Sequence, residues 1–532
     1  MKTRSKVWIA GFFTLVIGTL ALVGWTVFQV DPFFHYHEPH TDKYFYRLNN
    51  QRSQNDGIIK HFEYDALITG TSMTENFQTS DMDSIFGTKS IKVSYSGGSY
   101  KEINDMLRTA LSENSELKTI VRSIDMDYFL KDKDAMRQDL GDYPTYLYDD
   151  LWYNDVKYLF NRNVIFERVY PMMSERKKEW FKPGITSFDE YSYWGSKYEY
   201  GIKTVCPNGL SEPWRAEPVS LSEEDRETVL DNVRQNITSL TEDYPDVTFY
   251  YFFAPYSIVS WRDWMNNGVI YRQLEAERII IEEILKCDNI KLYSFNNLTN
   301  ITTDLNHYKD KTHYGPWINT LMLQYMKDET CLLTYENYEQ YLDEERTFYT
   351  TYDYTLVNAQ TDYEDDHYAE VLLGDEMPAG DSLDVLAALR DTMELSQAKI
   401  VSNQYNGQLG LECVGSLQRP VKSELSIPEY MIQKEYVGAK FTLEDIGRYQ
   451  YLTFYGIKKQ YHGQPFVAIY DQYQRVVSQY RKHYRDLDNE WQQYTMDVSK
   501  LSGPVTIVLN GGYVDDTGNL NSTFIFSNII LS

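Results

Sequence analysis

Ser72, His313 and Asp310 are residue types that together can carry out acyl transfer, and each follows a stretch expected to form a strand. Ser72 ends the segment ALITGTS, and His313 ends the segment DKTH, which begins with Asp310. A serine hydroxyl becomes a nucleophile when an imidazole accepts its proton. A carboxylate bound to that imidazole orients the ring and stabilises its positive charge. The three residues therefore predict a site for acyl transfer or ester hydrolysis.

Ser72 is expected at the start of a helix, where backbone N–H groups can stabilise an oxyanion. The segment lacks the second glycine of a G-x-S-x-G elbow, which disfavours the α/β-hydrolase fold. Two other interpretations stay open. The residues around His313 are polar loop residues without a catalytic role, or Asp304, His307, Asp310 and His313 bind a metal. Metal binding is the weaker interpretation, because metal ligands must converge on one point. Residues spaced by three positions do not all lie on one face of a strand or of a regular helix.

Strand-like and helix-like stretches alternate through residues 60–327, interrupted by a Tyr/Trp-rich insertion at residues 131–217. Apolar runs predict strands at 66–69, 91–96, 119–121, 247–253 and 290–293, and helical spacing predicts helices at 100–113, 222–240, 271–285 and 317–326. Such alternation predicts an α/β domain, with a parallel sheet covered by helices on both faces. Ligands of such sheets bind beyond the carboxyl ends of the strands, where Ser72 and His313 are expected to meet.

The GTS segment after the first strand, a glycine after the second, and D-x-x-H near the end of the domain resemble the SGNH (GDSL-like) hydrolase superfamily. The chain is most similar to its membrane-anchored branch, which includes alginate O-acetyltransferases and the protein required for D-alanylation of teichoic acids. The resemblance implies a flavodoxin-like domain with Ser72 as nucleophile, His313 as base and Asp310 as orienting acid. It also implies an oxyanion hole formed by the Ser72 N–H and that of Gly97 or Gly98.

One departure from this pattern concerns the third strand. The superfamily usually has G-x-N-D there, with the asparagine donating to the oxyanion, whereas this chain has Ser123, Ile124, Asp125, Met126 and Asp127. No asparagine is present, and a carboxylate would repel an oxyanion. Another donor is therefore required, or turnover is weak.

The N-terminal segment at residues 7–30 carries no charge over 24 residues. At 1.5 Å per residue it spans about 36 Å, enough to cross a hydrocarbon core of about 30 Å. Basic residues precede it and none follows directly, so we expect a cytoplasmic N-terminus and an uncleaved anchor at the plasma membrane, with the bulk of the chain outside. The bulky end of the run disfavours signal-peptide cleavage. The next residues, HYHEPH, place His35, His37 and His40 together, either as a juxtamembrane turn or, less in keeping with their position, as a metal site.

The chain is expected to divide into a basic tip and anchor (residues 1–30), an α/β domain (31–330), a linker or peripheral segment (331–396) and a β domain (397–532). Short apolar runs separated by turn residues in the last part predict an all-β sandwich or jelly roll. The closing FIFSNIIL and the earlier Trp491 resemble jelly-roll carbohydrate-binding modules. Aromatic residues in this region either bind sugar rings or pack in the core; the candidates are Tyr455, Tyr461, Tyr473 and Trp491.

A formal net charge of −27 excludes the electrostatic footprint of a nucleic-acid-binding protein. The four cysteines are far apart and contain no C-x-x-C pair, which disfavours zinc and redox sites and leaves either buried free thiols or two disulfides. No metal or other cofactor is expected.

Together these features predict an acyltransferase or esterase that modifies hydroxyls of a cell-surface or exported polysaccharide. The resemblance implies a membrane-bound O-acyltransferase as a partner. The alternative is a catalytically reduced scaffold that binds polysaccharide in a glycan export or modification complex.

Overall fold

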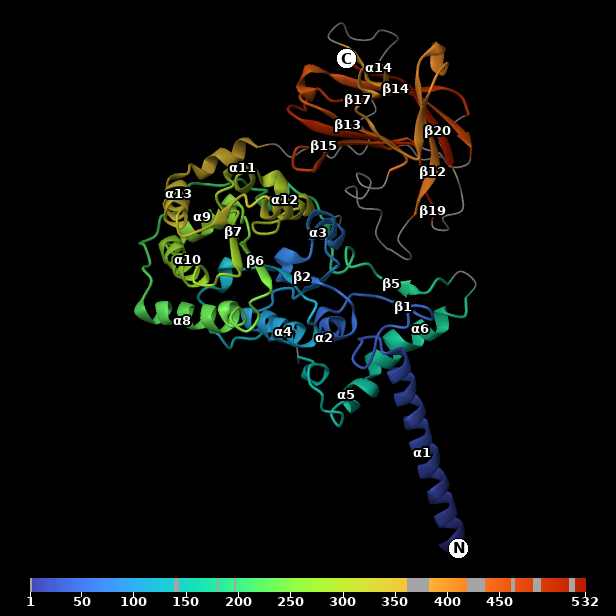
Figure 1. The fold of residues 1–532 in the computed structure, drawn as a ribbon, viewed down its shortest axis with the longest axis vertical. Coiled ribbons are helices and arrows are strands. Elements are labelled where there is room, and N and C mark those ends of the chain that lie inside the picture. Colours follow the sequence, from blue (N-terminus) through green and yellow to red (C-terminus); the bar gives the residue numbers. More distant parts are fainter. Residues whose placement is uncertain are drawn as a thin grey trace. The chain divides into compact units, whose positions relative to one another are not determined.

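The computed structural model describes residues 2–137, 143–178, 181–195, 198–360, 382–418, 436–460, 465–481, 489–515 and 522–532. The chain forms two compact units. Unit 1 comprises Met1–Trp194 and Val205–Gln360, and unit 2 comprises Gly195–Thr204 and Thr361–Ser532. Figure 1 shows helices and strands alternating in unit 1 and strands predominating in unit 2.

The centre of unit 1 is a six-stranded sheet in the order β3-β2-β4-β6-β7-β8. The strands are β2 (Ala66–Gly70), β3 (Ser90–Ser94), β4 (Thr119–Ser123), β6 (Thr248–Phe253), β7 (Ile290–Ser294) and β8 (Leu332–Leu333). The strands β2, β3, β4, β6 and β7 are parallel to one another, and β8 is antiparallel to β7. Across the sheet, the second parallel strand of the chain lies at the edge and the first lies beside it, followed by the third, fourth and fifth. All five residues of β2 are buried, as expected for a parallel strand covered on both faces. The predicted α/β domain is confirmed.

Two groups of helices flank this sheet (Figure 1). In one, α2 (Gln51–His61), α4 (Tyr100–Glu113), α8 (Glu223–Val233) and α10 (Ile270–Ile284) lie in series, and α8 reaches α4 through the turn that follows it; in the other, α3 (Thr79–Phe86) packs against α12 (Pro316–Lys327). Two further helices, α9 (Ile258–Asn266) and α13 (Tyr338–Thr351), contact each other, and α13 also contacts α10. The predicted helices at 100–113, 271–285 and 317–326 correspond to α4, α10 and α12. The predicted helix at 222–240 forms α8 and a π-helical turn, Arg234–Thr238.

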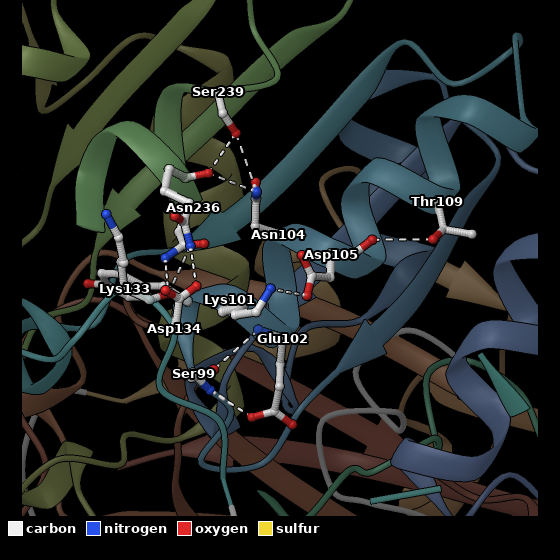
Figure 2. Close-up of polar contacts among 12 residues, drawn as sticks. Ser99, Lys101, Glu102, Asn104, Asp105, Thr109, Lys133, Asp134, Asn236 and Ser239 are labelled. Carbon is white, nitrogen blue, oxygen red and sulfur yellow. Dashed lines mark hydrogen bonds and ion pairs between the residues drawn. The ribbon is translucent and has the colours of Figure 1, made fainter. Parts of the chain in front are cut away.

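The start of α4 is fixed by a capping box, shown in Figure 2. The Ser99 hydroxyl accepts from the Glu102 N–H at 3.2 Å, and the Glu102 carboxylate accepts from the Ser99 N–H at 2.9 Å. Such caps satisfy N–H groups that have no partner within the helix. Asn104 ties α4 to the turn after α8, because its amide donates to the Ser239 hydroxyl at 3.3 Å. The turn at Gly97 and Gly98, which precedes Ser99, is thereby held at the sheet edge.

The helix α1 (Lys2–Val30) precedes unit 1 and contains an apolar span at Ser5–Val30 with a mean hydropathy of 2.2. Its length and composition suffice to cross a membrane, and none of its most apolar window is buried in the protein. The predicted apolar N-terminal helix is therefore present.

In the described part of the insertion at 131–217 the elements are short: a 3-10 turn (Thr145–Leu147), α5 (Val156–Leu159), a π-helical turn (Val164–Val169), α6 (Tyr170–Glu175), β5 (Gly184–Ile185) and α7 (Ile202–Val205). The strand β1 (Phe45–Tyr46) pairs with β5 in parallel. The expected linker at 331–396 differs from the structure. It contains β8 and α13, which belong to unit 1, and the boundary between the units falls after Gln360.

Unit 2 consists of two antiparallel sheets. One has the order β10-β13-β18-β15-β16 and the other β11-β12-β20-β14-β17; β9 pairs with β20, and β19 pairs with β12 in parallel. The strands are β9 (Leu383–Asp384), β10 (Glu394–Ser396), β11 (Ala398–Val401), β12 (Gly410–Gln418), β13 (Gly438–Leu443), β14 (Tyr451–Gln460), β15 (Phe466–Asp471), β16 (Val476–Arg481), β17 (Gln492–Asp497), β18 (Val505–Asn510), β19 (Tyr513–Asp515) and β20 (Ser522–Leu531). The short helix α14 (Val385–Leu389) follows β9. Residues of both sheets share one core, including Phe441, Phe454, Ile469, Leu509 and Phe526. The predicted two-sheet β domain is confirmed.

Candidate active site

Ser72 lies at the carboxyl end of β2, in a single 3-10 turn, Ser72–Thr74. The Thr71 hydroxyl accepts from the Met73 N–H at 3.4 Å and so caps this turn. Gly70 has φ 144°, and a Cβ there would lie 2.3 Å from Ser123 Oγ. Because a side chain at this position would collide with Ser123, only glycine allows β2 to approach β4 so closely. The positive φ of Gly70 also lets the chain leave the strand and enter the turn that begins at Ser72.

The structure brings Ser72, His313 and Asp310 together, although Ser72 and His313 are 241 positions apart. Ser72 Oγ is 2.8 Å from His313 Nε2. His313 Nδ1 is 2.9 Å from Asp310 Oδ2 and 3.0 Å from Asp310 Oδ1. With the Nδ1 proton directed at the carboxylate, Nε2 is free to accept the serine proton. This is the geometry of a nucleophile, a base and an orienting acid.

Asp310 is held in its ionised form by its surroundings. Burial opposes ionisation, but hydrogen bonds from the His313 ring and from the backbone N–H groups of His313 and Thr312 outweigh it, so the pKa of Asp310 falls well below its ordinary value. The two backbone hydrogen bonds measure 2.8 and 2.9 Å. A permanently charged Asp310 stabilises the imidazolium that forms when His313 takes a proton.

The two candidate oxyanion glycines occupy different positions. The Gly98 N–H donates to the Tyr95 carbonyl at 2.7 Å and is engaged within its own turn. Among the residues that the structure describes, the N–H groups of Ser72 and Gly97 have no hydrogen-bond partner. Gly97 has φ 57°, and a Cβ there would lie 2.0 Å from Arg137 Nη1. The N–H groups of Ser72 and Gly97 are therefore the candidate donors to an oxyanion.

Asp125 follows β4 and contacts Thr71, which precedes Ser72 in the chain. Its Oδ2 accepts from the Thr71 hydroxyl at 2.5 Å and from the Ser123 hydroxyl at 3.3 Å. Its Oδ1 is buried and has no partner among the described residues. Burial raises the pKa of Asp125 to about 6. The carboxyl is therefore mostly ionised at neutral pH and takes up its proton as the pH falls through about 6.

Trp194 forms a wall of the site that the sequence did not reveal. Its ring meets the His313 ring edge to face at 5.6 Å between centroids, and Lys309 Nζ lies 4.1 Å from its centre. The indole Nε1 donates to Glu75 Oε2 at 2.9 Å. Burial raises the pKa of Glu75. Trp194 lies within the irregular insertion at residues 131–217, and no periodicity in that stretch points toward His313.

The metal interpretation of Asp304, His307, Asp310 and His313 does not fit the geometry. His307 is buried, and its Nδ1 accepts from the Trp317 indole at 3.0 Å. His313 is bound to Ser72 and Asp310. Within the described residues no group of three or more His, Cys, Asp or Glu side chains is placed to hold a metal, and this includes His35, His37 and His40. The four cysteines are free thiols.

Two of the candidate sugar-binding aromatics of unit 2 lie in one cluster, joined by a residue that the sequence did not single out. Tyr405 stacks on Tyr455 at 3.8 Å between centroids and lies 5.6 Å from Trp491. All three are partly exposed. Tyr473 lies in the turn between β15 and β16, on the other sheet, and Tyr461 lies outside the described residues.

No protein-family model and no curated protein sequence matches the chain. Among solved structures, a protein from Streptococcus pneumonia provisionally described as a platelet activating factor matches with 12% identity and a TM-score of 0.27, over 53% of this chain and 91% of its own. The module CsCBM6-3 from Clostridium stercorarium, in complex with cellobiose, matches with 8% identity and a TM-score of 0.18, over 30% and 97%. A family 11 carbohydrate-binding module of Clostridium thermocellum matches with 13% identity and a TM-score of 0.16, over 31% and 94%. All three TM-scores lie below 0.5.

Proposed function

We propose that the chain is a membrane-anchored, extracytoplasmic enzyme of the SGNH type that transfers an acyl group to, or removes one from, a polysaccharide hydroxyl. The observation that carries this proposal is the 2.8 Å contact between Ser72 Oγ and His313 Nε2, with Asp310 behind the imidazole. The strand order of unit 1 supports the SGNH assignment. Its five parallel strands lie in the order β3-β2-β4-β6-β7, which is the flavodoxin-like order. Sheets of this order bind ligands beyond the carboxyl ends of their strands.

The proposed reaction has two steps. In the first, Ser72 Oγ attacks the acyl carbonyl while His313 Nε2 takes the serine proton, and the N–H groups of Ser72 and Gly97 bind the oxyanion. The tetrahedral intermediate then collapses, His313 returns the proton to the leaving group, and the acyl group stays on Ser72 as an ester. In the second, a sugar hydroxyl or water gives its proton to His313 and attacks this ester, and Ser72 regains the proton as the product leaves.

The hydrogen bonds that join Ser72, His313 and Asp310 contribute little to the stability of the fold. A hydrogen bond contributes about 1 kcal/mol to folding, and less where water competes. His313 and Asp310 are partly exposed, with 24% and 43% of their side-chain surface accessible. Three polar groups from segments 241 positions apart therefore meet in a catalytic geometry at a site where folding gains little. This favours a chemical role for Ser72.

The proposed membrane anchor bears on whether the enzyme transfers the acyl group to a glycan or hydrolyses an ester. If α1 crosses the membrane with the basic residues before it on the cytoplasmic side, unit 1 lies outside beside the bilayer. A membrane-bound O-acyltransferase could then deliver an activated acyl group to Ser72. Transfer to a cell-surface glycan is the direction that this placement favours.

The test is labelling of the full chain, in detergent, with a fluorophosphonate probe that reacts with activated serines. Labelling is expected for the unmodified chain and for Ser112→Ala, which removes an exposed serine of α4. It is expected to be lost in Ser72→Ala and strongly reduced in His313→Gln. Circular dichroism checks that the variants fold. A folded chain that does not label would refute the proposed nucleophile.

A second function, glycan binding by unit 2, is favoured by the cluster of Tyr405, Tyr455 and Trp491. Aromatic faces that are partly exposed can pack on sugar rings. The test is affinity electrophoresis of the full chain in gels that contain soluble polysaccharides, with Trp491→Ala beside Tyr473→Ala on the other sheet as control. Loss of retardation in the Trp491 variant alone supports binding at the cluster. Equal behaviour of both variants would refute it, and retardation without serine labelling would favour a scaffold.

A further inference from the structure

A cluster of large apolar side chains is exposed on unit 1 in the segment around α5 and α6. Six of its members define what we call the aromatic foot: Leu151, Trp152, Tyr153, Phe160, Phe166 and Tyr170. Large apolar side chains gathered in this way on a water-facing surface generally mark a protein or membrane contact. Nothing in the proposed chemistry at Ser72 uses them.

The aromatic foot lies beside the end of α1. The helix contacts both α5 and the turn at Val164–Val169. At Gly24 a Cβ would lie 3.5 Å from Phe160 Cζ, so the Phe160 ring touches the helix itself. In Figure 1, α5 and α6 flank α1 where the helix meets unit 1.

Hydrogen bonds hold the foot against the residues that follow α1. The Tyr158 hydroxyl donates to Asp31 Oδ1 at 2.7 Å and accepts from the Phe33 N–H at 3.1 Å. Asp155 Oδ2 accepts from the Tyr36 hydroxyl at 3.1 Å. The foot is therefore attached to the helix exit and keeps its place relative to α1.

The depth of the foot follows from helix geometry. Gly24 precedes Val30, the last residue of α1, by six positions, which is about 9 Å along the helix axis. The apolar run exceeds a hydrocarbon core of about 30 Å by only about 6 Å. If α1 spans the bilayer, Phe160 lies at the boundary between acyl chains and headgroups. Tryptophan and tyrosine are enriched at this level of membrane proteins.

The charge of the same segment differs in sign from that of the chain. Residues 151–178 contain six basic side chains (Lys157, Arg162, Arg168, Arg176, Lys177 and Lys178) against three acidic ones, whereas the whole chain carries a formal charge of −27. Basic residues beside exposed aromatics are typical of surfaces that lie in the membrane interface and contact anionic headgroups.

We propose that the aromatic foot inserts into the outer leaflet of the bilayer that α1 crosses, and that the basic residues around it contact anionic headgroups. The proposal depends on the anchoring of α1 that is part of the proposed function. Its consequence is a two-point attachment, by a spanning helix and an interfacial foot, which restricts rotation of unit 1 about the helix axis.

The test uses the full chain in nanodiscs of phosphatidylcholine and phosphatidylglycerol, with or without bromine atoms on the upper part of the acyl chains. Bromine quenches tryptophan fluorescence only at short range. Trp152→Phe is compared with Trp214→Phe, which removes a tryptophan of equal exposure, 81% against 80%, on a part of unit 1 that packs near α9 and not near α1. Both substitutions replace exposed rings by a smaller ring, and both variants are expected to fold.

The expected result is that Trp152→Phe loses part of the bromine-dependent quenching and Trp214→Phe loses none. If the Trp152 variant co-migrates with nanodiscs and its quenching is unchanged, the proposed insertion of the aromatic foot is refuted. The proposed anchoring by α1 is not affected by that result. A chain that does not co-migrate with nanodiscs refutes the anchor, and the foot with it. Fluorophosphonate labelling of Ser72 is independent of all these outcomes, so failure of the foot is distinguished from failure of the proposed chemistry.

Discussion

Replacing Asp125 by asparagine tests the electrostatics of the candidate site most directly. The substitution keeps the shape of the side chain and removes its charge. The new amide oxygen can still accept from the hydroxyls of Thr71 and Ser123, which now donate to Asp125 Oδ2. The amide nitrogen would take the place of Oδ1, which has no partner among the described residues. The variant therefore isolates the effect of the buried charge.

The magnitude follows from the shift in pKa. Burial raises the pKa of Asp125 from 3.8 to about 6. Each pKa unit corresponds to about 1.4 kcal/mol, so a buried ionised Asp125 costs about 3 kcal/mol of folding free energy. Because the folded state has the higher pKa, the folded chain holds the proton more tightly. Stability is full below pH 3.8 and is lost as the pH rises through 6. Asp125→Asn removes this loss, so we expect a more stable chain at pH 8 and little change at pH 4.

The assay is urea unfolding of the full chain in detergent at several pH values, followed by tryptophan fluorescence, since Trp261, Trp264 and Trp317 all lie in unit 1. Asp246→Asn, at an exposed aspartate before β6, serves as the control for a simple change in charge. Curves for the unmodified chain and Asp125→Asn that remain parallel from pH 4 to 8 would refute the raised pKa. If the chain is active, Asp125→Asn should also be the faster enzyme above pH 6, because no carboxylate then opposes the oxyanion.

Three further predictions concern other parts of unit 1. Asp310→Asn should fold but lower kcat by about 10⁴-fold, because the His313 imidazole loses the partner that fixes its tautomer. Unchanged turnover would refute the role of Asp310 as the orienting acid. Glu345→Gln should lose less stability than the unmodified chain as the pH rises from 4.5 to 7, because burial raises the pKa of Glu345 from 4.5 to about 7 beside Glu277 and the folded state holds the proton over that range. Equal slopes of the two chains in urea titrations would contradict this. Gly57→Ala should lower the free energy of unfolding by about 1–3 kcal/mol, because a Cβ there would lie 2.4 Å from the Phe33 and Phe34 carbonyl oxygens; an unchanged midpoint in urea would refute this.

The sequence predicted those parts of the fold in which local pattern and tertiary structure agree. Runs such as residues 66–69 are apolar throughout because the strand is buried on both faces. The helix α8 begins where Ser222 and Asp225 form a capping box, as their spacing indicated. The helix α13 was missed because its buried face consists of Tyr341, Leu342, Glu345 and Tyr349, a set that looks polar in sequence. The pairing of Glu345 with Glu277 across α10 and α13 is a tertiary property.

The candidate site could be predicted where it depends on topology. Ser72 and His313 follow parallel strands, and the carboxyl ends of such strands lie at one edge of the sheet. The choice between Gly97 and Gly98 could not be made from sequence, because it depends on the hydrogen bond from the Gly98 N–H to the Tyr95 carbonyl. Trp194 reaches His313 from an irregular insertion, and only the folded chain brings the two rings together.

The junction between α1 and unit 1 bears on the direction of the proposed reaction. Asp31 follows the helix directly and is fully buried. Its carboxylate accepts from the N–H groups of His35, Tyr36 and His37 at 3.0, 2.7 and 3.2 Å. The next residues pack against Gly57, so no flexible tether separates α1 from the rest of unit 1.

A flexible tether would let an enzyme sample a range of heights above the bilayer. A rigid junction instead holds Ser72 at one distance from it. Hydrolysis of a polymer that extends far from the cell surface gains nothing from such a restriction. Transfer from a donor that is itself confined to the membrane does gain, because both reactants are then held in one layer and meet at a raised effective concentration. The rigid junction therefore favours acyl transfer over hydrolysis in the proposed function.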